Sequence, residues 1–157
     1  MQFYIEPLDQ SNAEKIASWH YEDEYAFYDP EADPEDLAEL LNPALRGESM
    51  FAVRDGAGEL VGFFAFQNKE GVVIFGLGLH PDLTGKGLGA DFVRVGLVFA
   101  QSRFSPKTIQ LHVAAFNKRA IKVYKRVGFR EVEHYMNRTN GGEFDFIRME
   151  LIDGLNQ

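Results

Sequence analysis

Three glycines at alternating positions, Gly85, Gly87 and Gly89, follow a strand-like apolar run at 72–79 and lead into a helical apolar pattern at 88–102. Lacking side chains, such residues let backbone N–H groups approach an anion closely, and the helix that follows adds the positive end of its dipole. A flexible turn is the alternative, but a turn does not require three alternating glycines that open an apolar helix. The segment therefore predicts an anion-binding loop.

The surroundings of this loop argue against two common nucleotide-binding folds. Gly85, Gly87 and Ala90 match the dinucleotide fingerprint loosely, yet five residues separate the strand-like run from the first glycine. No Asp or Glu lies between 105 and 125, where that fold needs an acid to hold a ribose. The triphosphate loop G-x-x-x-x-G-K-S/T does not occur. NAD binding is thus disfavoured and a triphosphate loop is excluded.

The order of the patterns indicates a mixed α/β domain, with antiparallel strands first, then a strand–helix–strand crossover and a closing hairpin. The expected elements, in chain order, are a strand at 3–5, a helix capped by Ser11 or Asn12, a helix starting at Asp33-Pro34-Glu35, strands at 50–53, 60–66 and 72–79, a helix at 88–102, a strand at 109–113, a helix at 118–127 and a hairpin of 129–135 with 144–151. The 157 residues contain no repeat, linker or low-complexity tract. A single domain over 1–157 is therefore expected.

Composition narrows the functional classes. The net charge of −8 argues against a nucleic-acid partner, despite the basic residues at 118–126. The chain has no cysteine, which excludes disulfides, thiolate nucleophiles and thiolate metal sites. No run approaches the roughly 18 apolar residues of a membrane helix, and residues 1–10 do not read as a signal peptide. We expect a cytoplasmic protein without membrane contact.

Charge is divided unevenly along the chain. Residues 1–80 hold 16 acidic side chains and four Lys or Arg, whereas residues 81–157 hold 8 acidic and 12 basic ones. This asymmetry indicates two faces that meet ligands of opposite sign, with chance distribution of solvated charges as the alternative.

The stretch 72–129 resembles the GNAT superfamily of acyl-CoA-dependent N-acyltransferases. The family's pyrophosphate loop, Gln/Arg-x-x-Gly-x-Gly/Ala, is similar to 84–89, although Thr84 departs from the usual Gln or Arg. A second hallmark, an Asn, a helix and a Tyr before Gly-Phe, corresponds to Asn117, Tyr124 and Gly128-Phe129. Within the superfamily, the chain looks most like the ribosomal-protein N-terminal acetyltransferases.

This resemblance implies a mostly antiparallel sheet of about six to seven strands, flanked by about four helices, with acetyl-CoA between splayed strands 72–79 and 109–113. The implied cofactor-binding residues are Leu77, Leu79, Thr84, Gly85, Lys86, Gly87, Leu88, Gly89, Ala90, Asn117, Ala120 and Tyr124. The pantetheine arm would pair with the backbone of Leu77 and Leu79. Lys86, Lys118, Arg119 or Lys125 would meet the adenosine phosphates. No metal is expected.

For catalysis, the resemblance implies Tyr124 as the general acid for the thiolate and the Leu79 backbone N–H as the group that polarises the thioester carbonyl. A packed structural tyrosine is the alternative for Tyr124. Gly76 and Gly78 fit a bulge that splays their strand.

The general base is not evident, because 72–79 carries no carboxylate. His20, Glu22, Asp23, Glu24 or a water chain are candidates. We expect His112 to be a satisfied core histidine, with a role as the base as the alternative.

The acceptor site in this family is shaped by the region between the first two helices, which is acidic and aromatic here. The expected substrate residues are Glu22, Asp23, Glu24, Tyr25 and Tyr28, which would suit a cationic acceptor. An acidic surface loop over an aromatic cluster is the alternative. The turn at 139–143 is expected to border the same mouth.

Together these features predict an N-acetyltransferase that moves an acetyl group from acetyl-CoA to a primary amine, by direct attack in a ternary complex. The acceptor would be a small cationic amine or a protein N-terminus, and the enzyme a monomer or a homodimer. A non-catalytic acyl-CoA-binding sensor with the same fold is the alternative.

Overall fold

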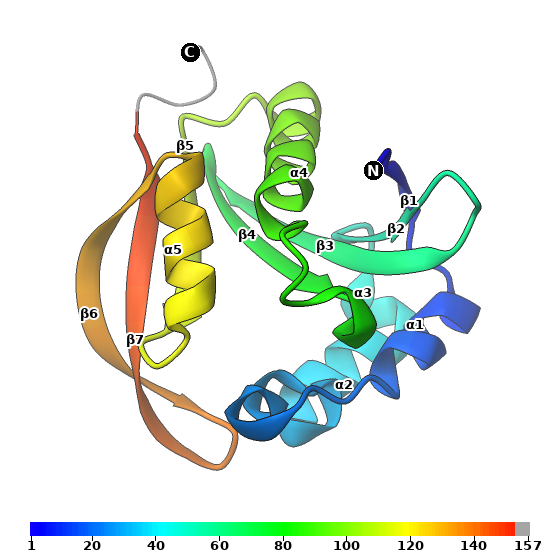
Figure 1. Ribbon diagram of the computed structural model, residues 1–157, viewed down its shortest axis with the longest axis horizontal. Coiled ribbons are helices and arrows are strands. Elements are labelled where there is room, and N and C mark those ends of the chain that lie inside the picture. The colour runs from blue at the N-terminus through cyan, green and yellow to red at the C-terminus, as the bar shows by residue number, and fades with distance from the viewer. Residues whose placement is uncertain (153–157) are drawn as a thin grey trace.

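The computed structural model describes residues 1–152 and contains one seven-stranded sheet with helices on both faces (Figure 1). The elements are β1 (Tyr4–Pro7), α1 (Gln10–Ala17), the 3-10 helices η1 (Asp23–Tyr28) and η2 (Pro30–Ala32), α2 (Pro34–Leu41), α3 (Pro43–Arg46), β2 (Met50–Arg54), β3 (Leu60–Lys69), β4 (Val72–Leu79), η3 (Pro81–Leu83), α4 (Gly89–Phe104), β5 (Thr108–Ala114), α5 (Lys118–Val127), β6 (Phe129–Thr139) and β7 (Gly142–Leu151). The strand order is β1-β2-β3-β4-β5-β7-β6, and β4 and β5 form its parallel pair. The expected mixed, mostly antiparallel fold is confirmed.

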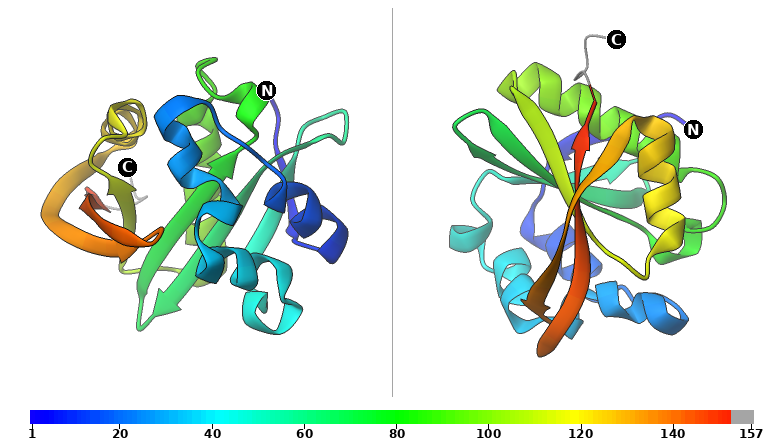
Figure 2. Two further views of the ribbon diagram at one scale, coloured as in Figure 1. Left: turned by 90° about the horizontal axis from the view of Figure 1, so that it is seen from below. Right: turned by 90° about the vertical axis from the view of Figure 1, so that its left-hand side faces the viewer.

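The sheet divides where β4 meets β5. These two strands pair only from Val72 with Thr108 to Ile74 with Gln110, and beyond that point they diverge. Figure 1 shows the two halves of the sheet spreading apart below the labels of β4 and β5, and Figure 2 shows the same divergence of the strands in two further views. The expected splaying of 72–79 and 109–113 is therefore present.

Two apolar clusters hold the layers together. Helices α4 and α5 cover one face of the sheet, where the largest buried side chains include Phe64 and Phe92. Helices α1 and α2 cover the other face at the β1–β3 end, around Ile16 and Trp19. Because α4 has Gly96 where it crosses the sheet, the Phe75 ring lies only 2.3 Å from the position that a β-carbon would take. The missing side chain allows this close approach of helix and sheet.

Two local expectations were wrong. Helix α1 is capped by Asp9, whose carboxylate accepts the Asn12 N–H at 2.8 Å, so the helix begins before Ser11. Strand β4 has no bulge, because its register with β3 runs unbroken from Val72 to Leu79. Gly78 instead makes room for the Phe63 ring, which lies 2.2 Å from the position of a β-carbon there.

Within the described residues, no helix combines the length and apolarity that crossing a membrane requires.

Candidate active site

The gap between β4 and β5 exposes backbone groups of β4. The His80 N–H donates to the Val61 carbonyl of the β3 side at 2.7 Å, and backbone groups of successive residues in a strand point to opposite sides. The N–H groups of Leu77 and Leu79 therefore point away from β3 and into the gap. Since the pairing with β5 ends at Ile74, no strand within residues 1–152 pairs with these two residues on the side away from β3.

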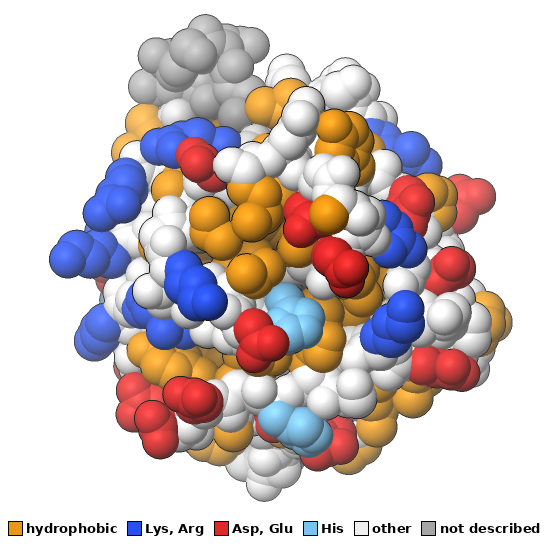
Figure 3. Space-filling view, turned by 45° about the vertical axis from the view of Figure 1, so that its right-hand side comes forward, with side chains coloured by type: hydrophobic (Ala, Val, Ile, Leu, Met, Phe, Trp, Pro, Cys, Tyr) orange, Lys and Arg blue, Asp and Glu red, His pale blue; other side chains and the backbone are white. Residues whose placement is uncertain are grey.

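A pocket of about 360 Å³ opens on the α4 and α5 side of this gap. Gly85 and Gly87 line it with φ of +74° and +78°, a backbone region that L side chains rarely adopt. Three basic side chains of α5 also line it: Arg119, Lys122 and Arg126. In the space-filling view Lys and Arg gather along the left edge, over α5 (Figure 3). This pocket has the glycine loop, helix start and positive charge that a phosphate-bearing cofactor needs.

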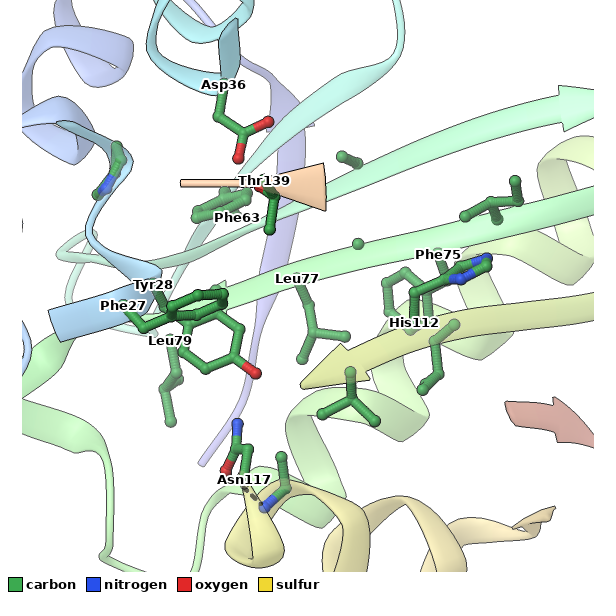
Figure 4. Close-up of a pocket in the computed structure, with 18 of the residues that line it drawn as sticks. Phe27, Tyr28, Asp36, Phe63, Phe75, Leu77, Leu79, His112, Asn117 and Thr139 are labelled. Carbon is green, nitrogen blue, oxygen red and sulfur yellow. Dashed lines mark hydrogen bonds between the residues drawn. The ribbon is translucent and has the colours of Figure 1, made fainter. Parts of the chain in front are cut away.

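A larger cleft of about 590 Å³ opens on the other side of the gap. Three carboxylates line it, Asp29, Asp36 and Glu39, together with aromatic side chains that include Tyr25 and Tyr28. Figure 4 shows Asp36 and Thr139 at one end of the cleft and Asn117 at the other. Burial, followed by the neighbouring acids Asp33, Glu39 and Glu35, raises the pKa of Asp36 to about 6.

The two hollows meet at a shared wall. The residues that line both are Leu77, Leu79, Thr84, Asn117, Arg119, Ala120 and Tyr124. The half-buried Tyr124 comes from α5, and burial of its hydroxyl and the nearby Tyr28 raise its pKa above the ordinary value. Tyr124 therefore stays protonated through the neutral pH range and is able to donate a proton there.

The segment 21–29 crosses the open end of the gap and contacts both strands that border it, β4 and β5. The Tyr21 hydroxyl donates to the Leu79 carbonyl of β4 at 2.8 Å, and the Tyr28 hydroxyl accepts the Ala114 N–H of β5 at 3.1 Å. Between them, the Arg119 guanidinium lies 4.3 Å from the centre of the Tyr25 ring. Three tyrosines thus fix this segment over the place where the strands part.

The end of β6 and the β6–β7 turn border the cleft, as expected for 139–143. The Asn140 side-chain amide donates to the Phe27 carbonyl of segment 21–29 at 2.7 Å, and the Thr139 hydroxyl donates to Asp33, beyond that segment, at 3.0 Å. Thr139 and Asn140 both line the cleft.

Of the residues predicted to hold the cofactor, all but two line at least one of the hollows. Lys86 and Leu88 do not, and the Lys86 side chain is exposed. Asn117 uses its side-chain oxygen to accept the Ala120 N–H at 3.1 Å, so it caps α5 from within the gap.

The expected acceptor residues separate into two groups. Tyr25 and Tyr28 line the cleft, whereas Glu22, Asp23 and Glu24 are exposed and line neither hollow. The acids inside the cleft are Asp29, Asp36 and Glu39, which lie later in the same acidic stretch. The sequence could not distinguish these sets, because nine of the 18 residues of 22–39 are acidic.

Sequence reasoning also missed two basic residues of the cofactor pocket, Lys122 and Arg126. Of the four basic candidates named for the phosphates, Arg119 alone lines a hollow. The spacing of Arg119, Lys122 and Arg126, three and then four residues apart, places them on one face of α5, and this spacing was the available signal.

His112 is not the packed core histidine that was expected. Its side chain is exposed on the cleft face of β5, and its Nδ1 lies 2.7 Å from the Tyr135 hydroxyl.

One cluster at the cleft rim combines side chains that can bind metals. The Nδ1 of His20 lies 3.0 Å from Asp29 and 3.5 Å from Glu31. The Asp29 carboxylate also accepts the Tyr21 N–H at 2.7 Å. The hydrogen bond to Asp29, with the charges of both acids, raises the pKa of His20 above its ordinary value. These bonds give the cluster a structural role at the start of segment 21–29.

The splayed sheet, the glycine loop at a helix start and the tyrosine in the gap define the class of acyl-CoA-dependent N-acetyltransferases. The chain belongs to the acetyltransferase (GNAT) family, whose family model matches residues 13–129. Members of this family use acetyl-CoA as cosubstrate.

Curated relatives extend this finding. An uncharacterized N-acetyltransferase of Methanocaldococcus jannaschii is 32% identical over 96 residues, which cover 56% of this chain and 42% of the relative. A spermidine N(1)-acetyltransferase of Vibrio cholerae is 26% identical over 153 residues, 90% of this chain and 83% of the relative. A mycothiol acetyltransferase of Streptomyces avermitilis is 37% identical over 82 residues, 50% of this chain and 26% of the relative. The chain spans only 26% to 42% of the length of the first relatives it matches.

Solved structures share the fold over nearly the whole chain. A chimeric spermidine N-acetyltransferase from Vibrio cholerae superimposes with a TM-score of 0.78 at 25% identity, covering 96% of this chain and 95% of that one. The Vibrio cholerae spermidine N-acetyltransferase in complex with CoA and spermine has a TM-score of 0.76 at 23% identity, with coverage of 96% and 95%.

Proposed function

We propose that the protein transfers an acetyl group from acetyl-CoA to a primary amine of a small cationic molecule, by direct attack in a ternary complex. One observation carries this proposal: a basic pocket and an acidic cleft lie on opposite faces of the sheet and share a wall at Leu77, Leu79 and Tyr124. A polyanionic cofactor and a cationic acceptor can therefore approach the same atoms from opposite sides.

On this proposal the glycine loop and α5 bind the phosphates, and the backbone of Leu77 and Leu79 pairs with the pantetheine arm. The Leu79 N–H, which points into the gap, stabilises the negative charge that develops on the thioester oxygen. Tyr124 donates a hydrogen bond to the departing thiolate and delivers its proton late. A free thiol of pKa about 8.5 is more acidic than a phenol of pKa about 10, so full proton transfer from Tyr124 to the thiolate is uphill and hydrogen bonding precedes it.

The acceptor is proposed to carry a second positive charge. The cleft holds Asp29, Asp36 and Glu39 beside aromatic rings, and this combination binds ammonium groups. The similarity to a spermidine N(1)-acetyltransferase over 90% of this chain supports an acceptor of this kind. A protein N-terminus is the second candidate, because it also presents a cationic amine.

The test is the release of free thiol from acetyl-CoA in the presence of single acceptors: diamines and polyamines, uncharged monoamines, amino acids and N-terminal peptides. We expect turnover with amines that carry a second cation, a higher KM for monoamines, and a KM that rises with ionic strength. Binding of CoA without thiol release for any acceptor would instead identify an acyl-CoA sensor.

A further inference from the structure

The start of α5 touches both the glycine loop and the segment that crosses the gap. Arg119, in the first turn of α5, lines both hollows. Its Nη1 lies 3.5 Å from the position that a β-carbon would take on Gly85, and its guanidinium lies 4.3 Å from the centre of the Tyr25 ring. Helix side chains lean toward the N-terminus of their helix, so Arg119 reaches across the start of α5 to both neighbours.

The charge of Arg119 is not matched by an acid of the protein. Among the ion pairs within residues 1–152 none involves Arg119, whereas Lys125 of the same helix pairs with Glu131. The first turn of α5 contains no acid, and Lys118 adds a second cation there. Basic side chains at a helix N-terminus are repelled by the positive end of the helix dipole. The position of Arg119 therefore favours an anionic ligand.

The middle of segment 21–29 is held from the same place. The two ends of the segment are hydrogen-bonded to β4 and β5. Between them η1 buries no residue, and Asp23 has φ of +53°, a region that L residues rarely adopt. The Tyr25 ring packs on Phe116, with 6.2 Å between the ring centres, and on Arg119. The middle of the segment thus rests on side chains from the start of α5.

A guanidinium group can serve both neighbours at once. It is planar, its N–H donors lie in the plane, and its face stacks on aromatic rings. The Arg119 guanidinium can therefore stay on the Tyr25 ring while it donates to phosphate oxygens on the side of Gly85.

We propose that Arg119 is a positioning residue that couples the two sites: the phosphates of the bound cofactor fix its guanidinium, which in turn fixes Tyr25 and segment 21–29 over the acceptor cleft. This inference rests on the part of the proposed function that assigns the cofactor phosphates to the basic pocket. An acceptor then meets a segment that is already ordered, so it binds more tightly to protein that holds CoA. Coupling between two sites is reciprocal, so the acceptor strengthens CoA binding by the same factor.

The experiment measures the Kd of CoA by calorimetric titration with and without saturating putrescine, a diamine. CoA carries no acetyl group, so no transfer occurs during the titration. In the wild-type protein putrescine should lower the Kd of CoA about fivefold. In Tyr25→Leu the ratio of the two Kd values should fall to one, whereas Tyr25→Phe, which keeps the ring, should retain the wild-type ratio.

Arg119→Gln and Lys122→Gln form a matched pair. Both residues line the cofactor pocket from α5, but of the two Arg119 also lines the acceptor cleft and contacts Tyr25. Each variant should bind CoA more weakly because a positive charge is lost. We expect the ratio of Kd values to fall to one in Arg119→Gln and to persist in Lys122→Gln. A ratio that survives in Arg119→Gln or Tyr25→Leu, or a ratio of one in wild-type protein that binds putrescine, would overturn the coupling and leave the proposed function standing.

Amide hydrogen exchange tests the same coupling without an acceptor. Saturating CoA should slow exchange of the amides of 21–29 in the wild-type protein and in Lys122→Gln, but not in Arg119→Gln or Tyr25→Leu. CoA binding that leaves exchange of 21–29 unchanged in the wild-type protein would contradict the inference. If no amine led to thiol release, the proposed function would fail, while the effect of CoA on segment 21–29 would still decide whether Arg119 couples the sites.

Discussion

Tyr124 owes its proposed role to its position at the start of the last turn of α5, three residues before the helix ends at Val127. From there its side chain borders both the cofactor pocket and the acceptor cleft. The sequence motif located this residue correctly in the chain, but it could not decide between a packed tyrosine and one at the meeting point of two sites.

The substitution Tyr124→Phe removes only the hydroxyl. We expect kcat to fall on the order of 10²-fold, because the thiolate loses its proton donor, while CoA affinity hardly changes. Steady-state kinetics and calorimetric titration with CoA check both parts. Turnover near the wild-type rate would exclude Tyr124 from the mechanism.

The substitution Gly76→Ala tests the wall of the acceptor cleft beside Leu77, which Gly76 lines. The added methyl group fits against Ala65 at 3.5 Å but takes up room in the cleft, so the KM of the acceptor should rise on the order of tenfold without loss of CoA affinity. Gly56→Ala is the control, since a β-carbon there, in the β2–β3 turn, meets no described residue within 4 Å. Equal acceptor KM values for the two variants would contradict a role of this wall in acceptor binding.

At the scale of elements, the sequence predicted β4 and α5 with their observed ends, because each is bounded by turn or cap residues that leave little choice. The ends of other elements differ from the predicted ones, because contacts with distant parts of the chain determine where those elements end. Strand β6 extends to Thr139, since its pairing with β7 continues as far as the two-residue turn at Asn140-Gly141. Which acids of 22–39 face the cleft depends on the path of segment 21–29, and that path is set by contacts to β4, β5 and the β6–β7 turn that lie up to 113 residues away.

The glycine loop gives the clearest test at this scale. Gly87 has φ of +78°, and a β-carbon there would meet no described residue within 4 Å, so Gly87→Ala adds backbone strain of about 1 to 2 kcal/mol without a clash. If the loop binds phosphates through its backbone amides, the strained loop of Gly87→Ala should bind CoA on the order of tenfold more weakly. Gly58→Ala is the matched control: Gly58 has φ of +83° and a β-carbon there would meet no described residue within 4 Å, but it lies in the β2–β3 turn. It should reduce thermal stability and leave the Kd for CoA unchanged; similar Kd values for both variants would contradict phosphate binding here.

At the scale of the whole molecule, the uneven charge of the chain has a spatial counterpart. The C-terminal half supplies the basic side chains of the cofactor pocket, and the N-terminal half supplies the carboxylates of the cleft. The sequence predicted two faces that meet ligands of opposite charge. It could not predict that the two sites share a wall, because that depends on where β4 and β5 part.

The pKa of Asp36 gives this division a pH dependence. Burial and neighbouring acids raise this pKa to about 6, so Asp36 is ionised at pH 7 and becomes neutral as the pH falls through 6. The KM of a diamine should therefore rise below pH 6 as the cleft loses this negative charge. Asp36→Asn should show the higher KM at pH 7 and lose this part of the pH dependence. A wild-type KM that stays constant between pH 7 and pH 5 would exclude Asp36 from acceptor binding.

The central claim is that cofactor and acceptor meet at the gap between β4 and β5 from opposite faces of the sheet. A bisubstrate compound, with CoA joined through its acetyl carbon to a diamine, tests it directly by calorimetric titration. If the two sites share the wall at Tyr124, the compound should bind on the order of 10²-fold more tightly than CoA, and Gly76→Ala should reduce that gain. Binding no tighter than that of CoA would contradict the claim.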